Sequence, residues 1–217
     1  MSLKLYFHPL SSFCWKVLIA LYENGTPFEP VVVNLGEEAS RAAFLDIWPI
    51  GQFPVIRDEA RDWLVPESSI IVEYLDQHYP GPTRFIPADP DLARQVRMRD
   101  RFFDLHVQVQ MQKIVGDRIR PDGQRDPYGV EQARTRLTTA LAMTEKAIGE
   151  EWAMGADFTL ADCSAAPALF YADKVISLKG KYDRTLAYLE RLKARPSFAR
   201  TLKEAAPFLS MFPAEKS

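Results

Sequence analysis

The chain has 217 residues, of which 47% are hydrophobic and 26% are charged, so it is long enough to bury the core of one large domain or two small ones. Its formal net charge of −2 excludes a general electrostatic attraction to nucleic acid or to anionic membranes. We therefore expect a small-molecule partner held by a local site, with no nucleic acid and no membrane involved.

Cys14 and Cys163 are the only cysteines, and the sequence contains no Cys-x-x-Cys pair. This usage argues against a disulfide framework and against a structural zinc site, and it fits a reducing compartment. The first five residues lack the long apolar region of a signal peptide, and no apolar run approaches the ~20 residues of a membrane helix. We expect a cytoplasmic protein without a bound metal.

The first eighty residues alternate between strand-like and helix-like segments. Residues 3–7 alternate apolar and polar positions as a strand does, and apolar residues then recur at helical spacing until Asn24-Gly25. Residues 28–35 have the unbroken apolar run of a strand covered on both faces, and residues 40–46 are typical of a short helix. This half of the chain thus begins β, α, β, α.

A hairpin and a third helix complete the first half. Two apolar triplets, 55–57 and 63–65, flank the charged stretch 58–62, which predicts a pair of antiparallel strands. Apolar residues from Ile70 to His78 then form a helical stripe. The order βαβαββα predicts a small mixed sheet with helices on its faces.

The second half is predicted to be helical. From Pro80 to Pro90 the composition turns to proline, glycine and aspartate, as in a linker, and no convincing strand follows. We divide the chain into a domain of residues 1–80, a linker of 81–91 and an all-helical domain of 92–217. Apolar spacing predicts helices at 92–117, 132–151, 159–175 and 184–195, with a short one from Ser197.

Thr159 begins the most sharply specified of these helices. The hydroxyl of Thr159, the acid at Asp162 and apolar residues at Phe158 and Cys163 predict a capping box with a hydrophobic staple. Such a cap typically contributes about 1 kcal/mol, and we interpret it as a stability feature.

Ser11 and Ser12 lie between the first strand and the first helix. Backbone N–H groups at a helix N-terminus favour an anion, and a serine hydroxyl there can donate to a thiolate held nearby. The alternative is that one of the two serines is an ordinary N-cap.

Gly51-Gln52-Phe53-Pro54 directly precedes a predicted strand. A cis bond before Pro54 would turn the N–H and C=O groups of Phe53 outward, where they could pair with an extended peptide. Because most X-Pro bonds are trans, an ordinary turn is the alternative.

Glu67 and Ser68 mark the change from the last strand to the third helix. Ser68 and the first helical N–H groups can bind a carboxylate, and Glu67 can bind an ammonium group. The pair therefore suits the free α-amino acid end of a small peptide. A helix cap with an acid at the positive end of the helix dipole is the alternative.

Together the three segments resemble the glutathione-binding domain of the cytosolic glutathione transferase superfamily, and the resemblance covers essentially the whole chain. Its most specific parts are Ser-Ser-x-x-Trp-Lys from Ser11, similar to the zeta class, and Phe53-Pro54-Val55 with Glu67-Ser68-Ser69-Ile70-Ile71, similar to the tau and zeta classes. The capping box at Thr159 also matches the family's second domain. The resemblance implies an α/β thioredoxin-like βαβαββα domain followed by an all-α helical bundle.

The resemblance also implies how glutathione would be held. Glu67 and Ser68 would bind its γ-glutamyl end. The backbone of Phe53, before Pro54, would pair with the cysteinyl part, and Gln52 would reach the glycyl carboxylate. The acceptor would be a small apolar electrophile bound against the helical domain, and the protein would be a homodimer.

Ser11 corresponds to the residue that stabilises the thiolate in the serine classes, with Ser12 as its rival. Tyr6 lies near the tyrosine that other classes use and is a further alternative. Phe13 stands where the zeta class has a cysteine, which argues against isomerase activity of the zeta type. Cys14, one residue later, is expected to be a buried structural cysteine.

The histidines and arginines give weaker signals. His8, His78 and His106 are dispersed without metal-ligand spacing, so we expect packing or surface roles. Three arginines share one face of the first long helix, at positions 94, 97 and 101. We interpret it as a solvated face, with a subunit contact and a ligand clamp as the alternatives.

Three classes of function remain open. The first is a glutathione S-transferase that conjugates glutathione to an apolar electrophile, which would make the protein a detoxification enzyme. The second is a glutathione-dependent isomerase, dehalogenase or peroxidase on the same scaffold. The third is a non-catalytic glutathione-binding interaction module. The set of Ser11, Phe53-Pro54, Glu67 and Ser68 favours an active thiol site over the third class.

Overall fold

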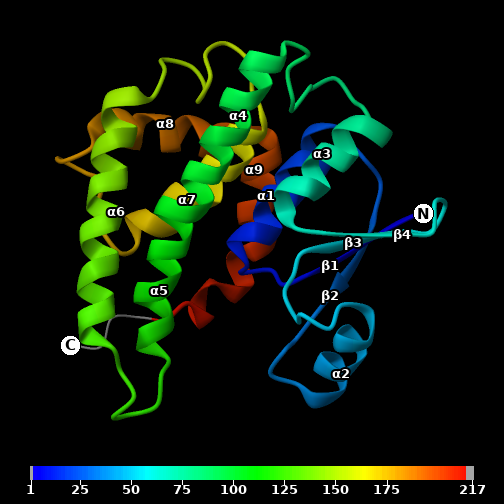
Figure 1. The fold of residues 1–217 in the computed structure, drawn as a ribbon, viewed down its shortest axis with the longest axis horizontal. Coiled ribbons are helices and arrows are strands. Elements are labelled where there is room, and N and C mark those ends of the chain that lie inside the picture. Colours follow the sequence, from blue (N-terminus) through cyan, green and yellow to red (C-terminus); the bar gives the residue numbers. More distant parts are fainter. Residues whose placement is uncertain (1, 214–217) are drawn as a thin grey trace.

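A computed structural model describes residues 2–213 of the chain. Four strands, with two helices between them, come first, and only helices follow (Figure 1). The strands are β1 (Leu3–Phe7), β2 (Glu29–Val32), β3 (Val55–Asp58) and β4 (Trp63–Pro66). The helices between and after them are α1 (Ser12–Glu23), α2 (Glu38–Ile47), α3 (Ser68–His78), α4 (Pro90–Phe102), η1 (Phe103–Gln108), α5 (Val109–Arg118), α6 (Pro127–Ala147), α7 (Leu160–Asp173), α8 (Asp183–Ala194), α9 (Pro196–Ala205) and η2 (Ala206–Met211). The predicted fold class is confirmed; the domain boundaries at 81–91 stay a prediction.

The four strands form one mixed sheet in the order β2-β1-β3-β4. β1 runs parallel to β2 and antiparallel to β3, and β3 pairs antiparallel with β4, as the hairpin pattern predicted. Figure 1 shows α1 and α3 on one side of the sheet and α2 on the other. Phe44 of α2 packs there with Val33 and Val55 in a separate small core.

β2 corrects one expectation from the sequence. Its apolar run predicted a strand covered on both faces, but β2 is an edge strand that pairs with β1 alone. Val32 is 56% exposed as a result. The hydrophobic run identified the strand correctly, but it could not show the position of the strand in the sheet, because that position depends on pairing with distant segments.

The first long helix also differs from its prediction. In place of one continuous α-helix over residues 92–117, the structure has α4, the π-helical turn η1 and α5 in succession. Such π turns often lie at functional sites. Here η1 packs against α6 and α7, and its Asp104 forms an ion pair with Lys16 of α1.

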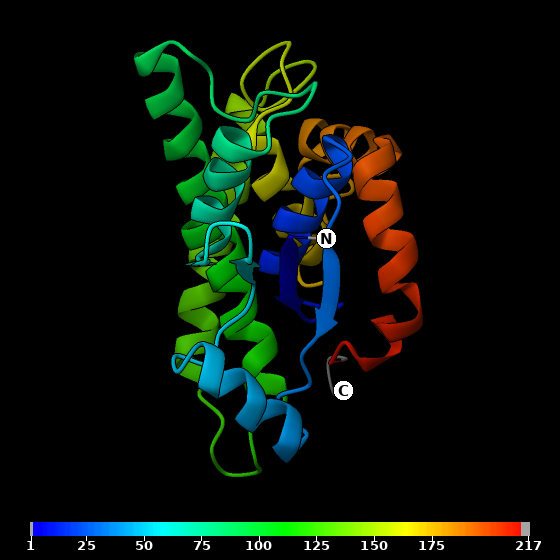
Figure 2. The same cartoon turned by 90° about the vertical axis from the view of Figure 1, so that its right-hand side faces the viewer.

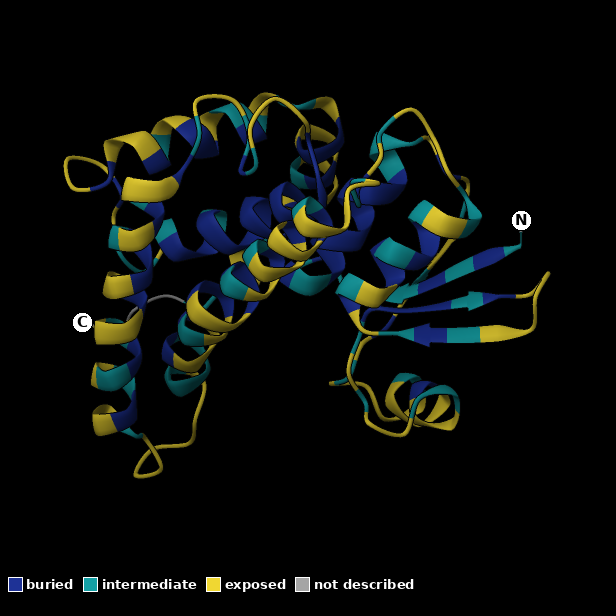
Figure 3. Ribbon diagram, turned by 45° about the horizontal axis from the view of Figure 1, so that its top comes forward, coloured by how far each residue is buried: buried dark blue, intermediate teal, exposed yellow. Residues whose placement is uncertain are grey.

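α7 is the centre of the helical half. Twelve of its fourteen residues are buried, and Figure 3 shows it dark blue along nearly its whole length while the surrounding helices expose their outer faces. The capping box of Thr159 and Asp162 is present, as predicted. α7 also packs against α1, and Figure 2 shows α1 between α4 and α5 on one side and α9 on the other. The two halves therefore share one core.

Candidate active site

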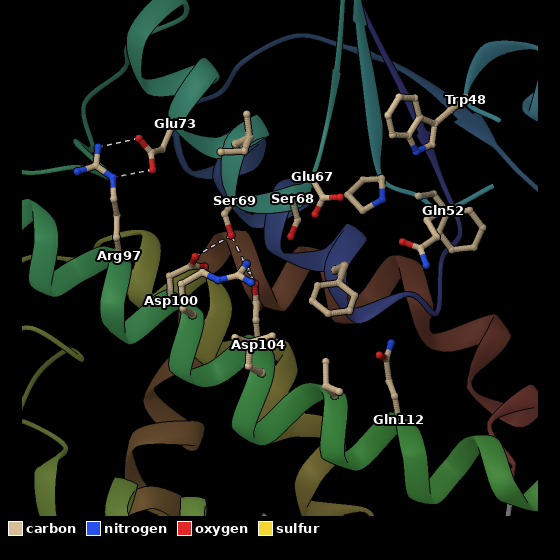
Figure 4. Close-up of a pocket in the computed structure, with 17 residues that line it drawn as sticks. Trp48, Gln52, Glu67, Ser68, Ser69, Glu73, Arg97, Asp100, Asp104 and Gln112 are labelled. Atoms are coloured by element: carbon tan, nitrogen blue, oxygen red, sulfur yellow. Dashed lines mark hydrogen bonds and ion pairs between the residues drawn. The ribbon is translucent and has the colours of Figure 1, made fainter. Parts of the chain in front are cut away.

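A cavity of about 640 Å³ opens between the sheet half and helices α4, η1 and α5 (Figure 4). It brings together side chains that are up to about a hundred residues apart in the sequence. The lining residues are Phe13, Trp48, Gln52, Phe53, Pro54, Glu67, Ser68, Ser69, Ile70, Glu73, Arg97, Asp100, Arg101, Asp104, Leu105, Val109 and Gln112. Five of the predicted site residues, Gln52, Phe53, Pro54, Glu67 and Ser68, thus lie in one cavity. We call it the polar cavity.

Glu67 and Ser68 form the N-terminus of α3 at this cavity. Glu67 is the N-cap, with φ at +69°, a left-handed conformation that is strained for a residue with a side chain. Its exposed carboxylate makes no hydrogen bond or ion pair within residues 2–213. Ser68 is the first helical residue and is 6% exposed. A free carboxylate thus lies beside a hydroxyl and the unpaired first amides of a helix, which can bind an ammonium and a carboxylate group respectively.

Gln52, Phe53 and Pro54 line the cavity from the loop before β3. The Phe53–Pro54 peptide bond is cis, as the sequence analysis considered. Figure 4 shows the side chains of Gln52 and Gln112 on facing walls, with Trp48 beyond Gln52. Sequence reasoning missed Trp48, because a single tryptophan after a short helix gives no signal of its role.

Lys16 lies beneath the polar cavity and bonds to three side chains that line it. It is 1% exposed, and its ammonium donates to Asp100 at 2.8 Å and to Asp104 at 2.6 Å. It also donates to the hydroxyl of Ser69 at 3.1 Å, and that hydroxyl donates to Asp100 at 2.7 Å. Ser164 of α7 donates to Asp100 as well. Burial raises the pKa of Asp104, and the Lys16 ammonium acts in the opposite direction. The network fixes α1 and α3 against α4, η1 and α7.

Two of the four arginines on α4, Arg97 and Arg101, line the polar cavity. Arg97 forms a two-pronged ion pair with Glu73 of α3, at 2.7 and 2.8 Å, and Arg101 lies 3.8 Å from Asp104. All three arginines of the predicted solvated face are exposed, and Arg94 pairs with Asp91 on the surface. A helical period shows that these arginines share a face, but the packing partner of that face depends on the tertiary structure.

A second cavity of about 390 Å³ adjoins the first. The two share Phe53 and Gln112. The second cavity is lined by His8, Leu10, Ser11, Ser12, Phe53, Gln108, Met111, Gln112, Val115, Gly116, Ile119, Tyr171, Phe212 and Pro213. Among these described residues there is no Lys, Arg, Asp or Glu. We call it the apolar cavity.

Ser11 lies at the N-terminus of α1 and lines the apolar cavity. It is the N-cap, and its hydroxyl accepts from the N–H of Cys14 at 3.3 Å. Three hydrogen bonds fix the preceding loop. The Ser11 N–H donates to His8 O at 3.0 Å, the Trp15 indole to Pro9 O at 2.6 Å, and the Tyr171 hydroxyl to Leu10 O at 2.8 Å. A side chain from α7 thereby positions the loop of the sheet half.

Ser12 lines the same cavity but is 4% exposed, at the first helical position. The other two N-terminal alternatives lie elsewhere. Tyr6 packs on Phe44 of α2, 6.1 Å between ring centroids, and lines neither cavity. Cys14 is fully buried, as predicted, and burial raises the pKa of its thiol to about 12. A thiol in this state is not a nucleophile at neutral pH.

Gln108 is the one buried side chain without hydrogen-bond partners in the part of the chain that the structure describes. It is 2% exposed, lies at the end of η1 and lines the apolar cavity. Leaving a buried amide group unpaired costs about 1–3 kcal/mol. Within the same described range, no three His, Cys, Asp or Glu side chains are placed to hold a metal ion.

Comparison with known proteins identifies the family. Residues 5–83 match the family model of the glutathione S-transferase N-terminal domain, and residues 127–207 match that of the C-terminal domain. A glutathione S-transferase-like protein from a Fusarium species is 32% identical over 164 residues, which cover 73% of this chain and 72% of that protein. The chain belongs to the glutathione S-transferase family.

Two further proteins similar to this glutathione S-transferase family member carry names that point to different functions. A stringent starvation protein A homolog of Haemophilus influenzae is 26% identical over 197 residues, 90% of this chain and 87% of that protein. The crystal structure of a glutathione S-transferase from Methylobacterium radiotolerans, in complex with glutathione sulfonate, superimposes with a TM-score of 0.80 at 26% identity and covers 99% of this chain and 96% of that one. The predicted family is thus confirmed, whereas the resemblance to the zeta and tau classes stays a prediction.

The helices of this family member are too short or too polar to cross a bilayer in the part of the chain that the structure describes.

Proposed function

We propose that the protein is an active glutathione transferase, which binds glutathione in the polar cavity and directs its thiolate at a small apolar electrophile in the apolar cavity. One observation supports this most directly: the two cavities meet at Phe53 and Gln112, and Ser11 lines the apolar one. A tripeptide with charged ends and a central thiol matches a polar site that adjoins an apolar one.

Glutathione would be held from both ends. The free carboxylate of Glu67 would bind the γ-glutamyl ammonium, and Ser68 with the first amides of α3 would bind the neighbouring carboxylate. The backbone of Phe53, next to Pro54, would pair with the cysteinyl part as an added strand. Gln52 would reach the glycyl carboxylate from the far wall.

Ser11 would stabilise the thiolate. A free thiol has a pKa near 8.5, so lowering it by about two makes the thiolate the majority form at neutral pH and corresponds to roughly 2.7 kcal/mol. A hydrogen bond to a charged group contributes about 1.5–3 kcal/mol, and the N-terminus of α1 adds to it. The Ser11 hydroxyl accepts the Cys14 N–H, and a hydroxyl that accepts one hydrogen bond can donate its own proton in another, here to the sulfur. Ser12 is the rival for this role.

The test has two stages. Calorimetry with glutathione measures binding, and turnover is then assayed with a chlorinated aromatic compound, an α-haloacid and an organic peroxide. Turnover of the aromatic compound supports conjugation, whereas selective turnover of the haloacid or the peroxide supports a dehalogenase or a peroxidase. Absence of any affinity for glutathione would reject the whole proposal.

A non-catalytic glutathione-binding module is the second candidate. We keep this candidate because the name of the Haemophilus relative refers to starvation and not to an enzymatic activity. Binding of glutathione without turnover of any acceptor would support this candidate. We also propose that the protein is a homodimer, that it is cytoplasmic and that it acts in detoxification. Sedimentation of the purified protein tests whether it is a dimer.

A further inference from the structure

His8 gives the apolar cavity a polar group that the sequence analysis did not assign. Its half-buried ring lines the cavity and stacks on Phe53, with ring centroids 5.9 Å apart and planes 18° from parallel. Phe53 is one of the two residues at which the cavities meet. His8 therefore lies next to the place where the sulfur of bound glutathione would enter the apolar cavity.

The hydrogen bonds of His8 fix its protonation. Nδ1 accepts the N–H of Leu10 at 3.2 Å, so the ring proton is on Nε2. Protonation of Nδ1 would break the hydrogen bond from Leu10, and burial also lowers the pKa of His8. Nε2 makes no hydrogen bond within residues 2–213 and is not among the buried unpartnered atoms, so its N–H is open to a ligand.

Among the described residues that line the cavity, the other polar side chains carry no charge. The Tyr171 hydroxyl is already donated to Leu10 O, and the amides of Gln108 and Gln112 are neutral. Met111, Val115 and Ile119 supply apolar surface opposite these groups.

We propose that His8 determines the acceptor of this enzyme: its Nε2–H donates to the carbonyl oxygen of an uncharged α,β-unsaturated carbonyl compound whose apolar body lies against α5. This inference rests on the proposed function, since it concerns the second substrate of the same site.

The reaction that this arrangement serves is conjugate addition. The thiolate sulfur forms a bond to the β-carbon, the electron pair of the carbon–carbon double bond moves toward the carbonyl group, and negative charge develops on its oxygen. The Nε2–H of His8 stabilises that oxygen as the charge appears, which is where a fixed donor lowers the barrier. The α-carbon then takes a proton from water, which replaces the proton that the thiol lost on binding.

The same cavity disfavours acceptors that carry a carboxylate. Moving an ionised carboxylate out of water is costly unless a cation or several donors compensate it. Neither His8, which is neutral, nor the amides supply a positive charge. We therefore expect strong discrimination between an uncharged acceptor and its acid.

The experiment uses the full chain, glutathione and three acceptors: methyl benzoylacrylate, the benzoylacrylate anion and benzyl chloride. Each kcat/KM is divided by the uncatalysed rate with glutathione. We expect the methyl ester to exceed the anion at least tenfold. In His8→Phe, which keeps a ring to stack on Phe53, the ratio of methyl ester to benzyl chloride should fall about tenfold, because displacement of chloride develops no charge on a carbonyl oxygen. His8→Gln, which retains a donor, should recover much of that ratio.

Three outcomes would overturn the inference. They are equal use of the ester and the anion, an equal loss toward the ester and benzyl chloride in His8→Phe, and no recovery in His8→Gln. Calorimetric affinity for glutathione in each variant separates these outcomes from misfolding. If the unmodified protein turns over benzyl chloride, the proposed function stands whether or not His8 plays this part. No turnover of any acceptor would overturn both.

Discussion

The ammonium nitrogen of Lys16 lies 2.6 Å from Oδ2 of Asp104. This contact joins the first helix of the sheet half to the π-helical turn η1, 88 residues later, and it lies directly below the cavity that we assign to glutathione. The ion pair is almost fully buried, with side chains 1% and 7% exposed. The geometry of the site thus depends on charges that are removed from solvent.

Lys16→Met should destabilise the fold by about 3–5 kcal/mol, since it leaves Asp100 and Asp104 as buried charges without their cation. Urea unfolding followed by circular dichroism measures the change. Lys4→Met is the matched control, because Lys4 forms an exposed pair with Glu59 and its loss should have little effect. Equal stability of the two variants would show that the buried network does not hold the halves together.

Ser68 and Ser69 are adjacent but should respond differently to substitution. Ser68→Ala removes a hydroxyl from the proposed carboxylate site, and the Kd for glutathione should rise about 10- to 100-fold, as for a lost hydrogen bond to a charged group. Ser69→Ala removes a partner of Lys16 and Asp100, so its main effect should be on the free energy of unfolding. Calorimetry and urea unfolding of both variants test this, and the reverse pattern would contradict our assignment of Ser68.

Ser11→Ala should retain glutathione binding but move the pKa of the bound thiol back toward about 8.5. The ultraviolet absorbance of the thiolate reports that pKa as pH is varied. At neutral pH kcat/KM should fall about 10- to 100-fold, in proportion to the thiolate fraction. Ser12→Ala is the control. If Ser12→Ala raises the pKa of the thiol and Ser11→Ala does not, the two roles are exchanged.

Ser11→Ala also removes the N-cap of α1, which should cost about 1 kcal/mol of stability. The activity assay is therefore done well below the melting temperature of the variant. An unchanged pH–rate profile in the folded variant would remove Ser11 from the mechanism.

Asp58 should make the stability of the fold depend on pH. Its carboxylate is buried, which alone would raise its pKa, but hydrogen bonds from Tyr74 at 2.6 Å, Tyr79 and two backbone amides outweigh burial and lower the pKa. The folded state therefore favours the ionised form. This contribution is present above the unfolded pKa of about 3.9 and is lost as pH falls through the lower folded value.

Asp58→Asn should accordingly lower the free energy of unfolding at pH 7, by about 2 kcal/mol, and the gap to the unmodified protein should narrow in strong acid. Urea unfolding across this pH range measures the gap. Asp62→Asn is the control on the same hairpin, because the Asp62 side chain is 86% exposed and its pair with Arg57 is screened by solvent. A gap that stays constant with pH would contradict the assignment of the lowered pKa to Asp58.

Local patterns were sufficient for much of the fold. Each strand of the sheet, the hairpin around residues 58–62 and the capping box at Thr159 follow from spacing, turn composition and side-chain chemistry within a few residues. Five residues that the sequence selected for glutathione also lie in one cavity. These features could be predicted because each depends on neighbours in the chain.

The sequence by itself determined the order of the elements, the family and the segments that carry the site. Only the tertiary structure decided that Arg97 and Arg101 face the polar cavity, that β2 lies at the sheet edge and that His8 lines the apolar cavity. The physical reason is that the periodicity of a helix or strand fixes the direction in which each of its side chains points. What a side chain meets there, such as Lys16 meeting Asp104, depends on the packing of segments far apart in the chain.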